Sequence, residues 1–148
     1  MKILMVCLGN ICRSPMAEGI LKHLAAEHDL DWTVDSAGTS RWHLGEPPDR
    51  RAIRTCQAHG IDISDQRARQ FSPSDFAEYD LILTMDDSNY QDVLAKARTD
   101  AERERVRRLT DYSTNGDQTV PDPYFDGRFE DVYVLLREVC SDLIRAHT

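Results

Sequence analysis

The hydrophobic pattern of the chain alternates between two periods. Lys2–Cys7 is almost continuously apolar and is followed by Gly9 and Asn10, a pattern typical of a parallel strand that is buried on both faces. Ser14 and Pro15 then have the residue types of a helix N-cap and a first helical position. The apolar residues that follow recur at helical spacing: Met16, Ala17, Ile20, Leu21, Leu24 and Ala25.

The same alternation of strand and helix continues along the rest of the chain. Apolar runs predict strands at Trp32–Ser36, Asp80–Met85 and, more weakly, Val106–Leu109. Capping residues and apolar spacing predict helices between them, which run from Asp49 to His59 with Gly60 as the stop, begin at Ser72-Pro73, and run from Asp86 to Ala97.

The last predicted helix is the clearest one. Asp126, Glu130 and Asp131 lie near its start, where the helix dipole favours acidic side chains. Its apolar residues step by three or four positions: Phe129, Val132, Leu136, Val139 and Leu143. Alternating strands and helices predict an α/β protein whose parallel sheet is covered on both faces. Ligands of such folds bind at the carboxyl ends of the strands, and Cys7 lies at one such end.

Composition and charge narrow the class of protein. The 148 residues suit one domain, and 41% hydrophobic with 30% charged residues indicates a soluble globule. A net charge of −8 excludes a generally basic nucleic-acid binder but allows an anionic substrate in a locally positive pocket. The opening apolar run, Ile3–Leu8, is too short for a signal-peptide core or a membrane span. Four cysteines are too few for a secreted disulfide scaffold, so we expect a cytoplasmic protein with free thiols and no membrane insertion.

The loop between the first strand and the first helix carries the strongest candidate chemistry. It reads Cys7-Leu8-Gly9-Asn10-Ile11-Cys12-Arg13-Ser14. Gly9 and Asn10 tolerate the positive φ angles that let a loop curl until its N–H groups point inward. A ring of amides at a helix N-terminus binds phosphate, and Arg13 can close the ring with two parallel hydrogen bonds.

The same positive field acts on Cys7. Thiols that face helix-end amides and an arginine have their pKa lowered to about 3.5–7.5, so they are thiolates at neutral pH. We therefore expect Cys7 to be a nucleophile, and the Ser14 hydroxyl to donate a hydrogen bond that eases departure of the thiolate later. Two other interpretations remain open here. Cys7 is an inert core thiol, or it forms a zinc finger with Cys12, His23 and His28, although the two histidines lie about 140° apart around a helix.

A thiolate that displaces a phenoxide or alkoxide from phosphorus benefits from a proton donor. The candidate donor is Asp122, in the segment Val120-Pro121-Asp122-Pro123-Tyr124-Phe125. Two prolines fix the backbone on both sides of its carboxyl group, and aromatic residues follow. The other interpretation of this segment is an ordinary proline turn before the last helix.

These segments together resemble the low-molecular-weight protein tyrosine phosphatase family. The resemblance begins at residues 7–18, which read CLGNICRSPMAE, and continues in order over nearly the whole chain. The other matching segments are Asp35-Ser36-Ala37-Gly38-Thr39, Trp42, Asp49-Arg50-Arg51-Ala52, His59-Gly60-Ile61, Ala68-Arg69-Gln70, Met85-Asp86 and Asp122-Pro123-Tyr124. The resemblance implies one low-molecular-weight phosphatase domain over 1–148, with a four-stranded, mostly parallel sheet of flavodoxin-like type.

The resemblance also implies a role for each residue of the site. Cys7 is the implied nucleophile, Arg13 binds phosphate and the transition state, and Asp122 is the general acid. The phosphate lies in a loop that consists of Leu8, Gly9, Asn10, Ile11, Cys12 and Ser14. The implied hydrogen-bond network that holds this loop contains Asn10, Ser14 and Ser36. The implied aromatic rim, which packs on the phenyl ring of the substrate, consists of Trp42, Tyr124 and Phe125.

Some residues refine the resemblance. Many family members have histidine where this chain has Gln66, and Phe125 stands where some have a second tyrosine. Trp42 matches members with an aromatic residue on the first recognition loop, which favours aryl phosphates. Cys12 shares its loop with Cys7, and the resemblance implies a reversible disulfide that protects Cys7 from over-oxidation. The alternative for Cys12 is a small apolar residue that fills the base of the loop.

Other polar and sulfur-containing residues have simpler interpretations. His43 shares a loop with Trp42, where contact with substrate is one interpretation and a solvated loop residue is the favoured one. His59 is interpreted as a helix C-terminal residue favoured by the dipole. The charged run 102–108 is interpreted as a solvated, self-paired surface. Cys56 and Cys140 lie at helical apolar spacing and are predicted to be core residues.

We therefore predict a phosphatase without metal or cofactor that hydrolyses phosphotyrosine in proteins, and aryl phosphates, through a phosphocysteine. We expect no nucleic-acid partner and either a monomer or a weak dimer. Three rival classes remain. An arsenate reductase needs further redox cysteines in a mobile segment, whereas Cys56 and Cys140 lie on predicted helices. A phosphocysteine carrier domain needs no general acid, and a catalytically dead phosphotyrosine-binding module does not need Cys7, Arg13 and Asp122 together.

Overall fold

The structure of the protein is a computed structural model that describes residues 1–115 and 118–148. Within these residues, four strands pair in parallel to form one sheet in the order β2-β1-β3-β4. The strands are β1 (Lys2–Cys7), β2 (Thr33–Gly38), β3 (Leu81–Thr84) and β4 (Val106–Arg108). The pairing confirms the predicted four-stranded parallel sheet of an α/β protein.

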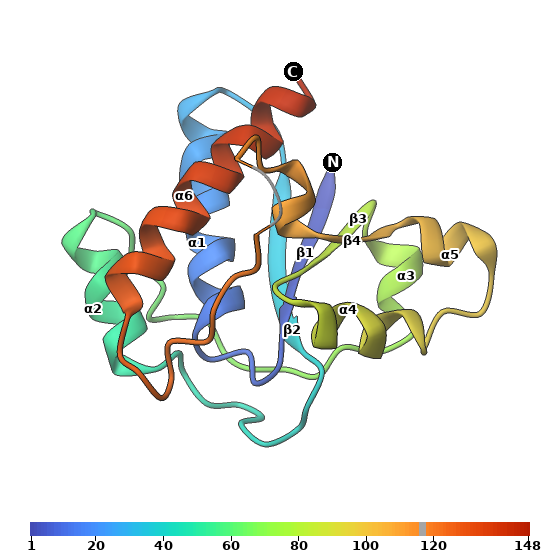
Figure 1. The fold of residues 1–148 in the computed structure, drawn as a ribbon, viewed down its shortest axis with the longest axis horizontal. Coiled ribbons are helices and arrows are strands. Elements are labelled where there is room, and N and C mark those ends of the chain that lie inside the picture. Colours follow the sequence, from blue (N-terminus) through green and yellow to red (C-terminus); the bar gives the residue numbers. More distant parts are fainter. Residues whose placement is uncertain (116–117) are drawn as a thin grey trace.

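Helices cover both faces of this sheet (Figure 1). On one face lie α1 (Arg13–Glu27), α2 (Arg50–Ala58) and α6 (Phe129–Ala146). On the other face lie the short helices α3 (Asp75–Glu78), α4 (Asp87–Leu94) and α5 (Asp100–Glu104). A 3₁₀ helix, η1 (Leu109–Tyr112), follows β4. No helix of the described ranges is both long and apolar enough to cross a membrane.

Strand β1 is apolar along its length because it is buried from both sides. Ile3 and Met5 belong to the core beneath α1 and α6, whereas Leu4 and Val6 belong to the core beneath α3 and α4. Because side chains of a strand alternate between its faces, a central strand with helices on both sides needs apolar residues at every position. Cys7 continues the row of Ile3 and Met5 and is therefore directed toward α1.

Three helix boundaries follow the capping signals of the sequence. The Asp49 carboxylate accepts a hydrogen bond from the Arg51 amide at the start of α2, and Gly60, just beyond its end, has a φ of +81°. The Asp86 carboxylate likewise caps α4 by accepting from the Asn89 amide. The first turn of α6 contains Glu130 and Asp131. These helices confirm the predicted elements to within a few residues.

The predicted start of α1 is wrong. Ser14 is not the N-cap, because the helix begins at Arg13 with Cys12 as its N-cap, and Pro15 is its third residue. The Ser14 hydroxyl lies 3.1 Å from the Cys7 sulfur and is not bonded to a backbone amide of the first turn. Pro15 is tolerated there because the first-turn amides have no partner within the helix.

Helix α5 was not predicted because it has no apolar period. Its residues 100–104 are all charged except Ala101, and none is buried. Thr99 caps the helix by accepting a hydrogen bond from the Glu102 amide at 3.1 Å. The charged run that begins here therefore forms a short helix and then enters β4, where Val106 is buried.

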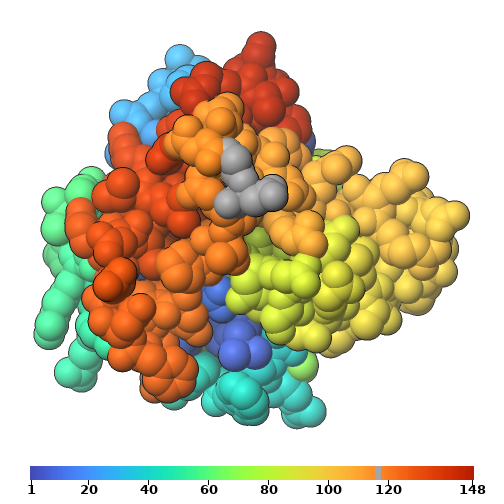
Figure 2. Space-filling view, in the orientation of Figure 1, coloured from blue at the N-terminus to red at the C-terminus, as the bar shows by residue number. Residues whose placement is uncertain are grey.

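The strand order places the topological switch point of the sheet between the central strands β1 and β3. Chain connections leave these neighbouring strands in opposite directions, and such a switch point opens a crevice at the carboxyl ends of the strands. Cys7 ends β1, and Asp86 follows β3. In the space-filling view, the blue region that follows β1 is visible between orange, yellow-green and turquoise segments (Figure 2).

Candidate active site

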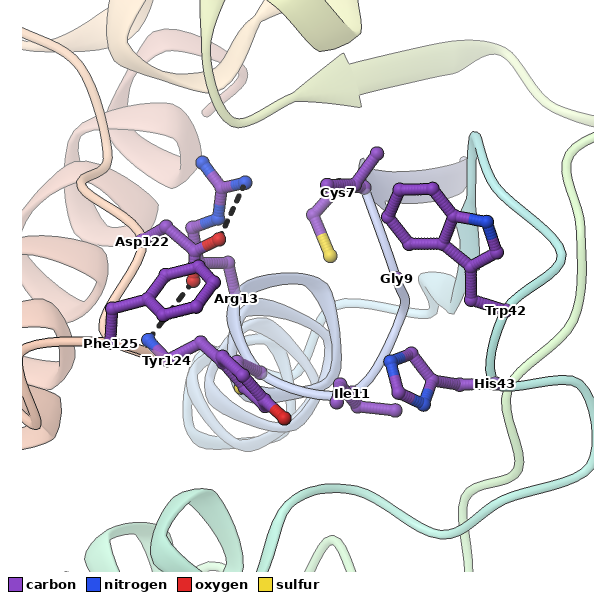
Figure 3. A pocket seen from close by; sticks show the side chains of 11 residues that line it. Cys7, Gly9, Ile11, Arg13, Trp42, His43, Asp122, Tyr124 and Phe125 are labelled. Atoms are coloured by element: carbon purple, nitrogen blue, oxygen red, sulfur yellow. Dashed lines mark hydrogen bonds and ion pairs between the residues drawn. The ribbon is translucent and has the colours of Figure 1, made fainter.

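A pocket with a volume of about 250 Å³ lies at the carboxyl end of β1. Three segments that are far apart in the sequence form its walls: residues 7–13, 42–43 and 122–125 (Figure 3). Its lining residues are Cys7, Leu8, Gly9, Ile11, Cys12, Arg13, Trp42, His43, Asp122, Tyr124 and Phe125. Of the residues expected at the site, Asn10, Ser14 and Ser36 are buried behind this wall.

The loop after β1 curls around the sulfur of Cys7. Asn10 has a φ of 58°, and its backbone amide donates a hydrogen bond to Cys7 Sγ at 3.3 Å. Gly9, in contrast, has no positive φ, so the expected reason for a glycine there is wrong. A Cβ at Gly9 would lie 3.1 Å from His43 Cδ2, so the glycine makes room for the imidazole ring.

The end of β2 holds this loop from below. The amides of Thr39 and Ser40 donate to the carbonyl oxygens of Cys7 and Leu8, each at 2.9 Å. A Cβ at Gly38 would lie only 2.8 Å from the Leu8 carbonyl oxygen. Because that contact is with backbone, any side chain at Gly38 would push the loop away from the strand.

Asn10 fixes the loop through all three of its side-chain hydrogen bonds. Its Nδ2 donates to Ser14 Oγ at 2.8 Å and to Ser36 Oγ at 3.0 Å, and its Oδ1 accepts from the Arg69 amide at 3.1 Å. Because Ser14 accepts from Asn10, its single proton is available for the Cys7 sulfur, 3.1 Å away. The Ala37 carbonyl oxygen is the more distant alternative, at 3.4 Å.

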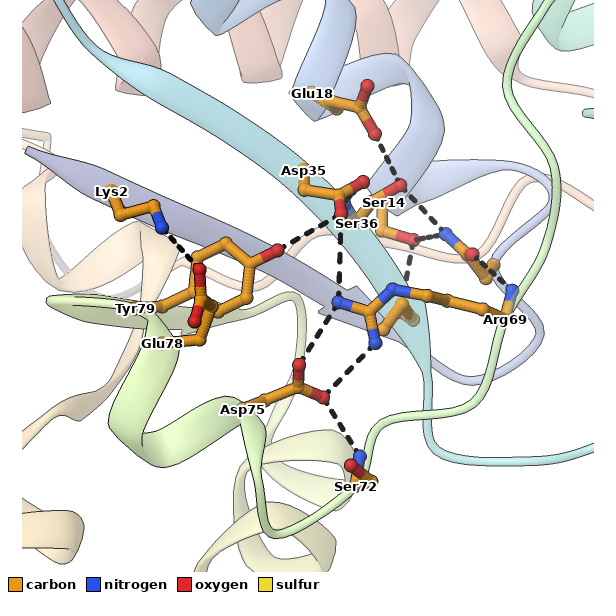
Figure 4. A network of polar contacts seen from close by, with 12 residues as sticks. Lys2, Ser14, Glu18, Asp35, Ser36, Arg69, Ser72, Asp75, Glu78 and Tyr79 are labelled. Atoms are coloured by element: carbon orange, nitrogen blue, oxygen red, sulfur yellow. Dashed lines mark hydrogen bonds and ion pairs between the residues drawn. The ribbon is translucent and has the colours of Figure 1, made fainter.

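The network continues from Ser36 to the surface. Ser36 Oγ donates to Glu18 Oε1 at 2.7 Å (Figure 4). Lys22 Nζ donates to Glu18 Oε2 at 2.6 Å. Glu18 is 3% exposed, and its burial raises the pKa of its carboxyl group even though Lys22 and Ser36 lower it. The hydrogen-bond chain therefore reaches from Cys7 through α1 and β2 to a surface lysine.

Arg69 anchors the segment that supports Asn10. Its guanidinium group forms two hydrogen bonds with the Asp75 carboxylate, at 3.1 and 3.2 Å, and lies 3.7 Å from Asp35 (Figure 4). Tyr79 Oη donates to the same Asp35 at 3.0 Å. These bonds fix residue 69, whose amide is the partner of Asn10 Oδ1.

Arg13 is held by groups from two other segments. Its Nη1 donates to Asp86 Oδ2 at 2.7 Å and to the Val120 carbonyl oxygen at 3.0 Å, while Nη2 lies 3.8 Å from Asp122 Oδ2. Burial by itself lowers the pKa of this guanidinium, but the charges of Cys7, Asp86 and Asp122 raise it above its usual value. Arg13 is therefore a fixed, permanently charged group at the base of the pocket, 3% exposed.

Asp122 lies at the mouth of the pocket, opposite Cys7 (Figure 3). The Tyr124 amide donates to its Oδ1 at 3.1 Å, while Oδ2 is the oxygen nearer to Arg13. Its side chain is 38% exposed, so the carboxyl group is in contact with solvent. The segment thus combines the predicted proline turn with a carboxyl group that faces the pocket.

Aromatic side chains surround the mouth of the pocket. Trp42 is 74% exposed and Phe125 is 89% exposed, on opposite sides of the opening. The Tyr124 and Phe125 rings pack edge to face with centroids 5.0 Å apart. Exposed aromatic surface of this extent at a pocket mouth provides a docking site for an apolar group.

All four cysteines are buried free thiols. Burial raises the pKa of Cys56 to about 12 and, with the nearby charges of Asp49, Cys7 and Asp122, raises the pKa of Cys12 as well. In the described ranges, no group of three or more His, Cys, Asp or Glu side chains is arranged to hold a metal ion. The zinc-finger interpretation therefore lacks a ligand cluster there.

Several residues acquire neighbours that the sequence did not reveal. His43 lines the pocket next to Trp42, where its Nδ1 bonds to the Glu46 carboxylate, and its side chain remains 30% exposed. The contact of Asp86 with Arg13 spans 73 positions, and no local pattern signals it. Gln66 donates to the Pro15 carbonyl oxygen at 3.1 Å, a contact that spans 51 positions.

Comparisons with known proteins place this chain in a family. The family model described as low molecular weight phosphotyrosine protein phosphatase matches residues 2–147. The chain is 46% identical over 149 residues to a protein of Synechocystis sp., covering 97% of this chain and 94% of that protein. It is 38% identical over 151 residues to the human low molecular weight phosphotyrosine protein phosphatase, covering 98% and 95%. The chain belongs to the low molecular weight phosphotyrosine protein phosphatase family, as its sequence segments suggested.

Solved structures of relatives have the same fold. YfkJ from Bacillus subtilis matches with a TM-score of 0.93 at 39% identity, over 99% of this chain and 93% of that chain. DARP, a drosophila arginine phosphatase, matches with a TM-score of 0.92 at 36% identity, over 100% and 98%. Since relatives on this fold are named for two different phosphorylated residues, the substrate of this chain has to be argued from its pocket.

Proposed function

We propose that the protein hydrolyses phosphotyrosine in other proteins through a phosphocysteine intermediate on Cys7. The observation that carries the proposal is the position of the Cys7 sulfur, which has the Asn10 amide at 3.3 Å and the Ser14 hydroxyl at 3.1 Å. Both groups stabilise a thiolate better than a thiol, and a thiolate is the nucleophilic form.

In the first step, Cys7 Sγ attacks phosphorus and the bond from phosphorus to the phenolic oxygen breaks. Nη1 of Arg13 is occupied by Asp86 and the Val120 carbonyl, so Nε and Nη2 are the two donors left to bind equatorial phosphate oxygens. Backbone amides of residues 8–13 supply the other donors. Asp122 gives its proton to the departing phenoxide, and phosphocysteine remains.

In the second step, water attacks the phosphocysteine and the phosphorus–sulfur bond breaks. Asp122, now a carboxylate, accepts a proton from that water as it attacks. Inorganic phosphate leaves, and the hydrogen bond from Ser14 stabilises the Cys7 thiolate that is released. All bonds are made and broken by groups of this chain and water, so the reaction uses no metal or cofactor.

The apolar rim supports an aryl substrate. A phenyl ring that extends from a phosphate at the loop would pass between Trp42 and the Tyr124–Phe125 pair. Phosphoarginine is the competing substrate because the drosophila relative is named for it. An arginine side chain is a thinner, charged chain, and it would cover less of the rim than a planar ring does.

The test is hydrolysis of a phosphotyrosine peptide and of phosphoarginine, each with a chelator present. We expect faster turnover of the phosphotyrosine peptide, and acid quenching should trap phosphate on the peptide that contains Cys7. C7S should form no phosphoenzyme and still bind inorganic phosphate, because backbone amides of residues 8–13 supply most of the hydrogen-bond donors to phosphate. Faster turnover of phosphoarginine would reassign the substrate, and substantial turnover by C7S would remove Cys7 as the nucleophile.

The role of Asp122 is tested by leaving groups. D122A should lose about 10²–10⁴ in phosphoenzyme formation with phosphotyrosine, whose phenol has a pKa near 10. With p-nitrophenyl phosphate, whose phenol is far more acidic, the loss should be much smaller. Pre-steady-state release of phenol measures this step alone. An equal loss for both substrates would leave the segment as a structural turn.

A further inference from the structure

Arg51 connects two walls of the pocket although it does not line the pocket itself. It is the second residue of α2, and its Nε and Nη2 donate to the two carboxylate oxygens of Asp49, both at 3.1 Å. The same Nη2 donates to the Tyr124 carbonyl oxygen at 3.1 Å, a contact that spans 73 positions. One guanidinium group therefore holds both the start of α2 and the segment that contains Asp122.

The contact with the second wall includes aromatic rings. The guanidinium carbon of Arg51 lies 4.7 Å from the centroid of the Phe129 ring and 5.5 Å from that of Tyr124. Both distances are in the range of a cation–π attraction. Arg51 thus contacts the backbone and the ring of Tyr124, as well as the first residue of α6.

On its other side, Asp49 is bonded to the phosphate loop. The Asp49 amide donates to the Ile11 carbonyl oxygen at 2.8 Å. Partial burial raises the pKa of the Asp49 carboxyl group, but hydrogen bonds from Arg51 outweigh this and lower it below its usual value. The Asp49 carboxylate is therefore ionised at neutral pH and remains a full partner of Arg51.

The segment that carries Asp122 has few other ties near its centre. It is anchored upstream, where the Val120 amide donates to the Met85 carbonyl oxygen at 3.0 Å, and downstream by α6. Between these anchors Pro123 is buried and its carbonyl oxygen accepts from the Gly127 amide at 2.9 Å, whereas Asp122 and residues 124–126 are exposed. The Tyr124 amide donates to Asp122 Oδ1, so the residue that Arg51 holds is also the one that orients the carboxyl group.

We propose that Arg51 is a positioning residue, which keeps Asp122 over the phosphate loop by holding Tyr124 against Asp49. The proposal rests on the proposed function, in which Asp122 is the general acid. It assigns Arg51 a role in geometry and not in stability, because exposed ion pairs contribute little to folding. Proton transfer, in contrast, is sensitive to the placement of the donor, and a displacement near 1 Å can cost about 10²-fold in rate.

The experiment compares R51A, R51K and a control, R54A, in which an exposed arginine of the same helix is removed. Each variant is assayed with aryl phosphates of increasing leaving-group pKa. With phenyl phosphate, R51A should lose about 10- to 100-fold in kcat/KM. With p-nitrophenyl phosphate it should stay within about threefold of the wild type, because that leaving group needs little protonation.

Further readouts separate positioning from a merely structural role. R51A should keep the wild-type inhibition constant for inorganic phosphate and the wild-type Tm. R51K should recover part of the loss of kcat/KM with phenyl phosphate, because it restores one hydrogen-bond donor to the Tyr124 carbonyl. R51A should also add little to D122A with phenyl phosphate, since both changes remove the same proton transfer. R54A should resemble the wild type throughout.

Three results would overturn the proposal. One is a loss in R51A that is equal for all leaving groups, and another is weaker phosphate binding, which would make Arg51 a support of the phosphate loop. The third is full additivity of R51A with D122A. If D122A alone shows no dependence on the leaving group, the acid assignment itself fails, which identifies the proposed function as the source of the failure.

Discussion

Both amide hydrogens of Asn10 and both Nη1 hydrogens of Arg13 have acceptors within the protein. Asn10 uses both amide hydrogens on Ser14 and Ser36, so the Ser14 hydroxyl has its own proton left for the Cys7 sulfur. Arg13 uses both hydrogens of Nη1 on protein acceptors, so its remaining edge is free for substrate. At this scale a substitution acts by removing a particular hydrogen-bond donor. A substitution that keeps the charge, such as arginine to lysine, still changes the geometry of the hydrogen bonds.

Arg13 provides the first prediction at the residue scale. R13K keeps the charge, but a single ammonium nitrogen cannot reach Asp86, the Val120 carbonyl and two phosphate oxygens at once. We expect a loss of at least about 10² in kcat/KM, the size seen when one transition-state donor is removed. Steady-state kinetics with a Tm control measures it. If kcat/KM of R13K is within a few-fold of the wild-type value, two parallel hydrogen bonds from residue 13 to phosphate are not needed.

Cys12 provides the second prediction at this scale. We expect peroxide to convert the Cys7 thiolate to a sulfenic acid, which the Cys12 thiol then attacks with loss of water to form a Cys7–Cys12 disulfide. Because burial and nearby negative charges raise the pKa of Cys12, its thiolate is scarce and this second reaction should be slow. A sulfenic-acid reagent should therefore trap Cys7 before the disulfide forms, and raising the pH should speed disulfide formation.

Peptide mapping and reactivation measure the outcome of this oxidation. A thiol reductant should restore activity to the wild type after mild peroxide treatment. C12S is the matched control and should lose activity irreversibly, since Cys7 then proceeds to sulfinic acid. Disulfide formation between Cys7 and any other cysteine, or full recovery of C12S, would contradict the assignment of Cys12 as the redox partner.

At the scale of secondary-structure elements, the N-cap residue of helix α4, Asp86, binds both its own helix and Arg13. Asp86 Oδ1 caps the helix by accepting from the Asn89 amide at 2.8 Å, and Oδ2 accepts from Arg13 at 2.7 Å. The loop after β3 therefore orients Arg13 with the same carboxylate that caps the next helix. The carboxyl ends of β1 and β3 are coupled in this way across the switch point of the sheet.

The two tasks of Asp86 can be separated by substitution. D86N keeps one oxygen, which can cap α4 or accept from Arg13 but not both. Since asparagine caps a helix about as well as aspartate, we expect D86N to remain near wild-type stability and lose kcat/KM. D86A should be less stable by a further ~0.5–2 kcal/mol in urea unfolding, because the cap is lost as well. Wild-type activity in D86N would show that Arg13 needs no orienting carboxylate.

The elements themselves were largely predictable. Burial on both faces of β1 requires a continuous apolar run, and burial of one face of α6 requires apolar residues at helical spacing. The start of α1 was not, because Ser14 has the residue type of a cap but its hydroxyl is directed to Cys7. The contact between Arg51 and Tyr124 was not predictable either. It spans 73 positions, and only the fold brings the two residues together.

At the scale of the whole molecule, the hydrogen-bond network of the site extends through the fold to solvent. Glu18 is its last buried member, bonded to Ser36 on one side and to the exposed Lys22 on the other. A carboxylate at this depth loses hydration, and its hydrogen bonds only partly replace it. The site is thus held by a group whose protonation contributes to the pH dependence of folding.

The sign of this contribution follows from the direction of the shift. Burial raises the pKa of Glu18 above its usual value of 4.5, so the folded state binds this proton more tightly than the unfolded state does. The resulting stabilisation is fully present below the usual glutamate pKa and is lost as the pH rises through the raised pKa of the folded state. E18Q cannot titrate and lacks this dependence.

We therefore expect the stability of E18Q, relative to the wild type, to increase as the pH rises from about 4 to about 7. Urea unfolding of both proteins at several pH values measures the difference, and other titrating groups cancel in the comparison. K22Q tests the sign of the effect. Lys22 lowers the pKa of Glu18, so its removal should raise that pKa further, and the stability that Glu18 contributes should fall more steeply with rising pH than in the wild type. A relative stability of E18Q that falls with rising pH would mean that Lys22 and Ser36 more than compensate the buried charge, and that the Glu18 carboxylate stabilises the fold in its ionised form.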